Sequence, residues 1–264
     1  MLKKLLKYDL KWIYKVILVF YALAIFFALL SFGLSKAENS TLLNVLAQIS
    51  CGFTVAMVAN CIVNSIMRSW VRFRNNMYKD ESYLTHTLPV SRHTVFLSKT
   101  LSAFICTFIS TAVSAACIVL CYYNNDVIKE SVKTMLGSLA DSFGVSKAAV
   151  LAFLVFIVFL EIMFILLAGY NGIILGHKSN KMKMAKSIII GFAVYIAFNI
   201  LTIVIICFAG VFDDRIMKMI TSADSVDVSA VKLCLIVALA VYAVYNLALY
   251  VIGGKCLEKG VNID

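Results

Sequence analysis

The side chains that could carry chemistry gather in one polar stretch, residues 79–99, which reads KDESYLTHTLPVSRHTVFLSK. It holds two of the three histidines, His86 and His93, the only proline, and the adjacent acids Asp80 and Glu81. The two histidines would share a helix face, but a metal site needs a third ligand and the stretch supplies none. The two acids fit the first turn of a helix better than an acid–base pair, because nothing near them would separate their pKa values.

Catalytic motifs are absent from the rest of the sequence. Neither the phosphate-binding G-x-x-x-x-G-K-[ST] nor H-E-x-x-H nor G-x-S-x-G occurs. Intramembrane enzymes need paired acids or histidines, and Glu161 is the only acid or histidine in the middle of a long apolar run. We therefore predict that the chain is not an enzyme and itself binds no metal or cofactor.

Long apolar runs dominate the elements that position these residues. The 264 residues are 62% hydrophobic and 14% charged, whereas a soluble domain is about 25% charged. Each run reaches the roughly 20 residues that a spanning helix needs, and no linker or repeat divides the chain. The predicted fold class is an all-α polytopic membrane protein, one domain over 1–264, with spans near 16–35, 42–67, 100–123, 148–175, 187–211 and 232–254.

The net charge of +10 could indicate nucleic-acid binding or membrane orientation, and its distribution decides between them. With six spans both termini share one side, which receives 17 of the 24 Lys and Arg residues, and the opposite side receives 7. The positive-inside rule then places both termini in the cytoplasm. We predict no nucleic-acid partner. The external connections would be a tight turn at 36–38 and two loops of about twenty residues, at 126–147 and 213–232.

The eight cysteines do not form a recognisable framework. Seven lie within apolar runs and Cys256 follows the last one, so none is well inside an external loop. We expect the cysteines to act as small apolar residues that pack between helices. We expect them to form neither a disulfide framework nor a metal site.

The first 15 residues predict an amphipathic elbow helix lying on the membrane surface. Its lysines face anionic lipid on one arc, and Trp12 lies among leucines on the other. Asp9 falls within the apolar face and would need a partner, which an arginine of the next polar segment could supply. A plain basic juxtamembrane segment is the alternative. The elbow residues singled out are Lys3, Lys4, Lys7, Asp9, Lys11 and Trp12.

Glu161 lies near the middle of the fourth apolar run, where an ionised carboxylate costs about 2.5–3.5 kcal/mol or more unless it faces protein. It could hydrogen-bond to an amide of another span, pair across a dimer interface, or line a transport path. The candidate amides are Asn60, Asn64 and Asn199. We expect Glu161 to face the protein interior.

The stretch 79–99 has its own pattern. Asp80 or Ser82 could cap a short helix ending near Thr87, and Pro89 would break it before a second helix begins at Ser91 or Arg92. Apolar anchors among polar residues are what a helix needs to dock into a partner's groove. These anchors are Tyr83, Leu84, Leu88 and Val90.

The segment around this stretch resembles the first cytoplasmic loop of bacterial ABC-2 type permeases; it reads YKDESYLTHTLPVSRHTVFLSKTLSA. In that family an acidic residue, Gly or Ser, and Tyr-Leu-Thr-x-Thr-Leu-Pro-Val-Ser lead into a Ser-Lys start of the third span. The opening LKYDLK and the linking segment YNGIILGHKSNKMKMAKSIIIG are also similar.

The resemblance implies a permease subunit of an ATP-binding-cassette exporter in the bacterial plasma membrane. Two such subunits, identical or related, would pair with two separately encoded ATPases that bind ATP and Mg²⁺. A coupling helix would lie between spans two and three. The coupling role would fall on Asp80, Glu81, Tyr83, Leu84, Thr85, Leu88, Pro89 and Val90. The cargo is not indicated.

Other classes of membrane protein are less well supported. A secondary transporter would show interrupted helices and several intramembrane charges, and a channel would show a filter or a charged ring. A regulatory or immunity membrane protein working without ATP fits the spans, but it leaves the TLPVS stretch unexplained.

Overall fold

The computed structural model describes residues 2–36, 41–79, 81–123, 126–221 and 227–260. All regular secondary structure in these ranges is helical. The all-α class predicted from the sequence is therefore confirmed.

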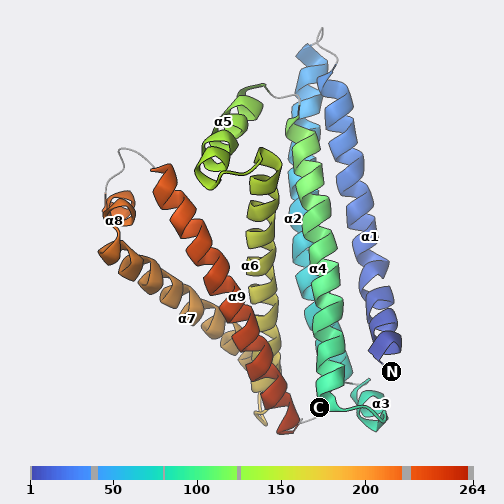
Figure 1. Ribbon diagram of the computed structural model, residues 1–264. Helices are drawn as coiled ribbons and strands as arrows, with labels where there is room; N and C mark the ends of the chain where they lie inside the picture. Colours follow the sequence, from blue (N-terminus) through green and yellow to red (C-terminus); the bar gives the residue numbers. More distant parts are fainter. Residues whose placement is uncertain (1, 37–40, 80, 124–125, 222–226, 261–264) are drawn as a thin grey trace. The chain divides into compact units, whose positions relative to one another are not determined.

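Six helices in the described ranges are long and apolar enough to cross a membrane (Figure 1), which confirms the predicted number. They are α1 (Leu2–Ser35), α2 (Thr41–Tyr78), α4 (Arg92–Tyr122), α6 (Lys147–Gly176), α7 (Lys183–Phe212) and α9 (Val228–Glu258). The 38 residues of α2 extend about 57 Å at 1.5 Å per residue. This exceeds the roughly 30 Å of a hydrocarbon core, so the polar residues after the apolar run continue the same helix.

Three shorter helices lie in connecting segments within the described ranges. They are α3 (Ser82–Thr87), α5 (Asp126–Phe143) and α8 (Asp214–Thr221). The two longer segments predicted as external loops, 126–147 and 213–232, thus contain α5 and α8. In α5, Leu139 and Ala140 are buried against Val150 of α6, with Val231 and Leu235 of α9 beside them. This apolar face explains why the segment is helical and not extended.

The chain forms two compact units, which we describe separately. Unit 1 comprises Met1–Arg72 and Thr94–Met135, and unit 2 comprises Phe73–His93 and Leu136–Asp264. The boundaries fall within α2, α4 and α5, so these three helices contribute to both units.

In unit 1, small and hydroxyl side chains line the contacts among α1, α2 and α4. Tyr21 of α1 makes a 2.6 Å hydrogen bond with Ser110 of α4 in this interior. The buried small residues of α4 recur about every four positions: Ser98, Ser102, Cys106, Ser110, Ser114 and Cys117. Small side chains let helix backbones approach closely, which replaces the hydrophobic driving force that helices lack in lipid.

The predicted elbow over residues 1–15 is not a separate helix. α1 runs without interruption from Leu2 to Ser35, and no Gly or Pro occurs before Gly33 to break it. The lysines of this segment are exposed while Asp9 and Ile13 are buried. The segment therefore continues the first long helix and is not the separate surface helix that the sequence predicts.

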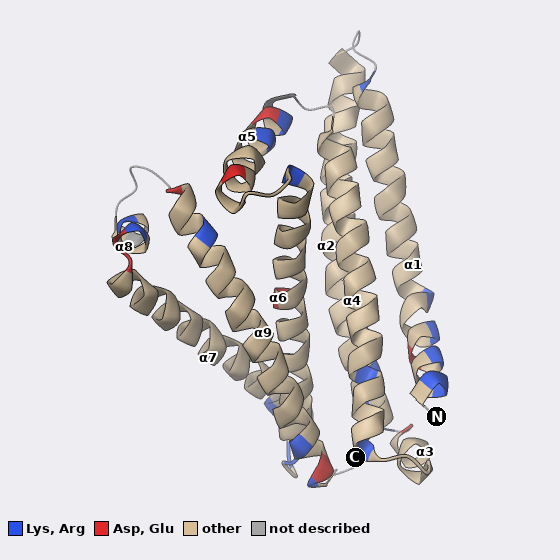
Figure 2. Cartoon of the chain, viewed as in Figure 1, with Lys and Arg blue, Asp and Glu red and all other residues tan. Residues whose placement is uncertain are grey.

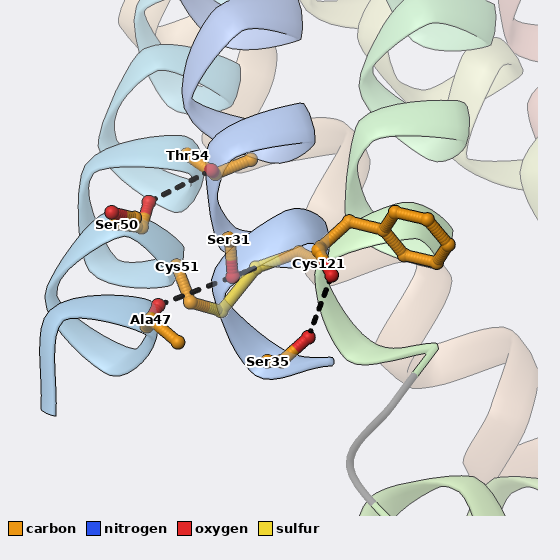
Figure 3. Close-up of a disulfide and its surroundings, with 8 residues drawn as sticks. Ser31, Ser35, Ala47, Ser50, Cys51, Thr54 and Cys121 are labelled. Carbon is orange, nitrogen blue, oxygen red and sulfur yellow. Dashed lines mark hydrogen bonds between the residues drawn. A yellow bond between two sulfur atoms is a disulfide. The ribbon is translucent and has the colours of Figure 1, made fainter. Parts of the chain in front are cut away.

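A disulfide joins Cys51 of α2 to Cys121 of α4 (Figure 3). The expectation that the cysteines serve only as packing residues is therefore wrong for this pair. Both residues lie within apolar runs far apart in sequence, and only the packing of α2 against α4 brings them together.

In unit 2, α6 and α7 cross at glycines. A Cβ atom added to Gly172 would lie 2.6 Å from Gly191 Cα, and one added to Gly176 would lie 2.5 Å from Ser187 Cα. Gly172 and Gly176 form a G-x-x-x-G pair, the spacing that allows close contact between membrane helices. The G-x-x-x-G spacing is visible in the sequence and by itself indicates a close helix contact here.

An aromatic cluster holds α6, α7 and α9 together farther along the same unit. Phe164 of α6 is buried and lies 5.6–6.0 Å from four surrounding rings. These rings belong to Tyr195 and Phe198 of α7 and to Tyr242 and Tyr245 of α9.

We predict that Gly176→Ala destabilises the protein by about 1–3 kcal/mol, because the added methyl group forces two backbones apart. Thermal unfolding in detergent measures the change. Gly191→Ala is the matched control, since its nearest atoms would lie at an ordinary 3.6 Å and its effect should be small. Equal shifts for both variants would contradict the close crossing.

Candidate functional site

The polar stretch at 79–99 forms a short helix and a proline turn. α3 begins after the N-cap residue Glu81, and Leu88 at its C-terminal end is extended, with φ −66° and ψ 138°. That conformation is the one favoured before a proline, here Pro89. The predicted helix–proline–helix arrangement is present. The N-cap residue of α3 is Glu81 and not Ser82, which lies inside the helix. The other predicted cap, Asp80, lies outside the described residues.

One face of α3 is anchored to the end of α2. The backbone N–H of Ser82 donates to the Lys79 carbonyl at 2.7 Å, and the Ser82 side chain is buried. His86 Nε2 lies 3.2 Å from the Met77 carbonyl oxygen, to which a protonated Nε2 would donate. The Asn76 amide donates to the Glu81 carboxylate. Glu81 and His86 therefore serve as anchors of α3.

The other face of α3 exposes large apolar side chains. Tyr83 is 63% exposed, Leu84 is 73% exposed and Leu88 is 41% exposed. Leu84 and Leu88 are four residues apart, so they project from the same side. Thr85 is half-buried and donates its hydroxyl to the Glu81 carbonyl at 3.0 Å. Since this segment lies outside the apolar runs, these exposed side chains form a candidate docking surface.

The start of α4 is held to the end of α9. Arg92 Nη1 donates to the Glu258 carbonyl at 3.3 Å, and the His93 ring packs edge-on to Tyr250 with centroids 6.3 Å apart. The turn containing Pro89 and Val90 is therefore bracketed by contacts on both sides. No pattern in the sequence indicates this attachment.

The end of α2 that carries α3 is also packed against α6. Phe73 stacks on Tyr170 with centroids 4.3 Å apart, and Tyr78 lies over His177 at 4.2 Å. The buried His177 ring in turn contacts Ser187 of α7 at 3.2 Å through Nδ1. The end of α2 next to α3 is therefore in contact with α6, and through His177 with α7.

Within unit 1, Asp9 is the centre of a buried ionic cluster. Its Oδ1 accepts hydrogen bonds from Lys99 Nζ at 2.6 Å and Arg72 Nε at 2.9 Å, and Ser98 Oγ donates to Oδ2 at 3.3 Å. The predicted arginine partner is thereby confirmed as Arg72. Lys99 was missed, because it lies ninety positions from Asp9 in the sequence.

Trp12 supports this cluster from one turn along α1. The Arg68 guanidinium lies over its ring at 4.1 Å from the centroid, and Arg68 Nη2 donates to the Trp12 carbonyl at 2.9 Å. Figure 2 shows basic residues gathered on the N-terminal turns of α1. The exposed members of this group are Lys3, Lys4, Lys7, Lys11 and Lys15.

Glu161 is half-buried on α6. Within the described part of the chain, no hydrogen bond or ion pair joins its carboxylate to another residue. The predicted amide partners donate to their own helices: Asn60 to Ala56, Asn64 to Asn60 and Asn199 to Tyr195. Asn246 of α9 is the nearby amide, since it donates to the Leu160 carbonyl at 2.9 Å.

No group of three or more His, Cys, Asp or Glu side chains that could hold a metal ion occurs among the described residues. Comparison of the chain with known protein families, with characterised proteins and with solved structures found no match. The arrangement of the residues therefore carries the functional argument.

We predict that Asp9→Ala destabilises the protein by about 3–5 kcal/mol, because it leaves the buried Lys99 ammonium without its carboxylate. Thermal or denaturant unfolding in detergent measures this loss. The double variant Asp9→Ala with Lys99→Met should recover much of it, since no buried ammonium then remains.

Arg215→Ala is the control for this prediction. It removes an ion pair with Asp213 in which the Arg215 side chain is 62% exposed, and such pairs contribute less than about 1 kcal/mol. A small effect of Asp9→Ala, equal to that of Arg215→Ala, would show that the cluster does not hold unit 1 together.

Proposed function

We propose that this chain is a membrane-spanning permease subunit of an ATP-binding-cassette exporter, with α3 docking onto a separately encoded ATPase. The observation that carries the proposal is the exposed apolar face of α3, formed by Tyr83, Leu84 and Leu88 on a segment anchored at both sides. The resemblance of the TLPVS stretch to ABC-2 type permeases and the six long apolar helices support it. In this proposal α3 is the coupling helix.

The proposed mechanism divides the chemistry between subunits. The chain has no phosphate-binding motif, so ATP and Mg²⁺ would be bound by the partner ATPase. When two ATPase subunits close on ATP, they would push on α3. The push would reach α2 and α4, which flank α3 in the chain, and α6 through the Phe73–Tyr170 and Tyr78–His177 contacts. Two permease subunits, identical or related, would enclose the path.

The proposed location is the bacterial plasma membrane, with both termini and α3 in the cytoplasm. The 17-to-7 division of Lys and Arg between the two sides supports this orientation. The exposed lysines at the start of α1 would then face anionic lipid headgroups. Glu161 remains a candidate for the path or the subunit interface, because it is half-buried without an ionic partner among the described residues.

We predict that Leu84→Asp abolishes co-purification of the ATPase in mild detergent. A carboxylate forced into the partner's apolar groove would weaken association by about 3–5 kcal/mol, which is more than a hundredfold in affinity. Pro89→Ala should be milder, because the anchors remain.

Val145→Asp is the matched control for this experiment. Val145 is 48% exposed in the connection between α5 and α6, on the side proposed to be external, so its variant should retain the ATPase. Full retention of the ATPase and of its stimulated hydrolysis by Leu84→Asp would refute the docking role and favour a membrane protein that works without ATP.

We predict that Ser131→Cys is labelled by a membrane-impermeant maleimide on intact cells and that Thr87→Cys is labelled only after permeabilisation. Both positions are exposed, so a difference reports the side of the membrane and not burial. Peptide mass spectrometry reads each site, which allows the native cysteines to stay in place. Labelling of Thr87→Cys alone on intact cells would invert the orientation.

A further inference from the structure

The Cys51–Cys121 disulfide lies where three helices of unit 1 meet. The two Cα atoms are 5.7 Å apart, a usual separation for bonded cysteines. Cys121 is the next-to-last residue of α4, and Ser31 Oγ of α1 lies 3.7 Å from its sulfur. Ser31 also donates to the Ala47 carbonyl of α2 at 3.1 Å (Figure 3). The bond therefore lies at the end of unit 1 opposite to Asp9.

The pairing is selective within unit 1. Cys61, Cys106 and Cys117 are buried and carry free thiols. Cys117 lies on α4 one helical turn before Cys121, in the same apolar run. It is therefore farther than Cys121 from the end of α4 at Tyr122. The bonded pair is thus the one that lies nearest to the end of α4 at Tyr122.

Orientation explains why this end is oxidised. Under the orientation proposed above, the end of α4 at Tyr122 faces the outside of the cell, where disulfides form and persist. The inference rests on that orientation, but it is independent of transport and of ATPase docking.

We propose that Cys51 and Cys121 are an oxidation site that is closed on the outer side after membrane insertion, and that the bond is a clasp stabilising unit 1. The oxidant is a protein disulfide of an extracytoplasmic thiol oxidase. One cysteine thiolate attacks that disulfide, forming a mixed disulfide and releasing one oxidase thiolate. The second cysteine attacks the mixed disulfide and releases the other, so the two thiols lose two electrons and two protons and the oxidase becomes a dithiol.

The clasp complements the ionic cluster at the other end of unit 1. There, Arg72 of α2 and Lys99 of α4 both bind Asp9 of α1. α2 and α4 are thus held together at both ends, by a covalent bond at one and through a shared carboxylate at the other. The bond joins cysteines 70 residues apart, so it also restricts the conformations of the unfolded chain. Reduction should therefore lower the free energy of unfolding of unit 1, while its helices stay formed in the folded state.

Counting reactive thiols tests the site. The full-length chain is isolated from membranes under acid quench, denatured, and alkylated with a polyethylene-glycol maleimide that shifts its gel mobility. With eight cysteines in the chain and six free thiols, we expect six additions without reductant and eight after reduction. Eight additions without reductant would overturn the proposal.

Matched serine variants locate the bond. Cys51→Ser should take seven additions with or without reductant, because Cys121 is then free. Cys117→Ser should take five without reductant and seven after reduction, because the bond is intact. The reverse pattern would assign the disulfide to other cysteines and overturn the site.

Thermal unfolding of the wild-type chain with and without a phosphine reductant tests the clasp and needs no variant. We expect the midpoint to fall by several degrees once thiol counting shows full reduction. Cys51→Ser should match the reduced protein in both conditions, whereas Cys117→Ser should still respond to reductant. An unchanged midpoint for fully reduced wild type would refute the stabilising role, whatever the outcome of the ATPase experiment.

Discussion

Close approach of helix backbones is the constraint on which both units depend. In lipid, apolar helices gain little by covering each other's side chains, so association relies on tight packing and polar contacts. Unit 1 meets this need with small residues along α4 and with the Tyr21–Ser110 hydrogen bond. Unit 2 meets it with Gly172 and Gly176 at the α6–α7 crossing. Leucine or phenylalanine at these positions would leave each helix apolar but would separate the backbones.

Charges are confined to places where they can be paired or hydrated. Asp9, Arg72 and Lys99 lie just beyond the ends of apolar runs, and their hydrogen bonds offset the cost of burial. Arg72 serves unit 1, while the next residue, Phe73, stacks on Tyr170 in unit 2. One turn of α2 thus contributes to both units, because successive side chains of a helix point in different directions. In the proposed function, this turn connects the docking segment to both units.

The exposed apolar side chains of α3 and those of the long helices differ in what can cover them. Exposed leucine and phenylalanine side chains on α1 or α7 lie in runs long enough to face lipid, and they need no protein partner. Leu84 is more exposed than most of these, but it lies between charged residues beyond the apolar runs. Lipid therefore does not account for its exposure together with that of Tyr83 and Leu88, which is why the proposal rests on this face.

The sequence by itself determined the number of long helices, the short helix before Pro89 and the need of Asp9 for a basic partner. These follow from run length, from backbone sterics and from the cost of a buried charge, which act locally. Only the tertiary structure decided that Lys99 shares Asp9, that Cys51 bonds to Cys121, and that Tyr78 lies on His177. Each of these contacts joins residues far apart in the chain, and their meeting depends on how helices pack, which no local pattern specifies.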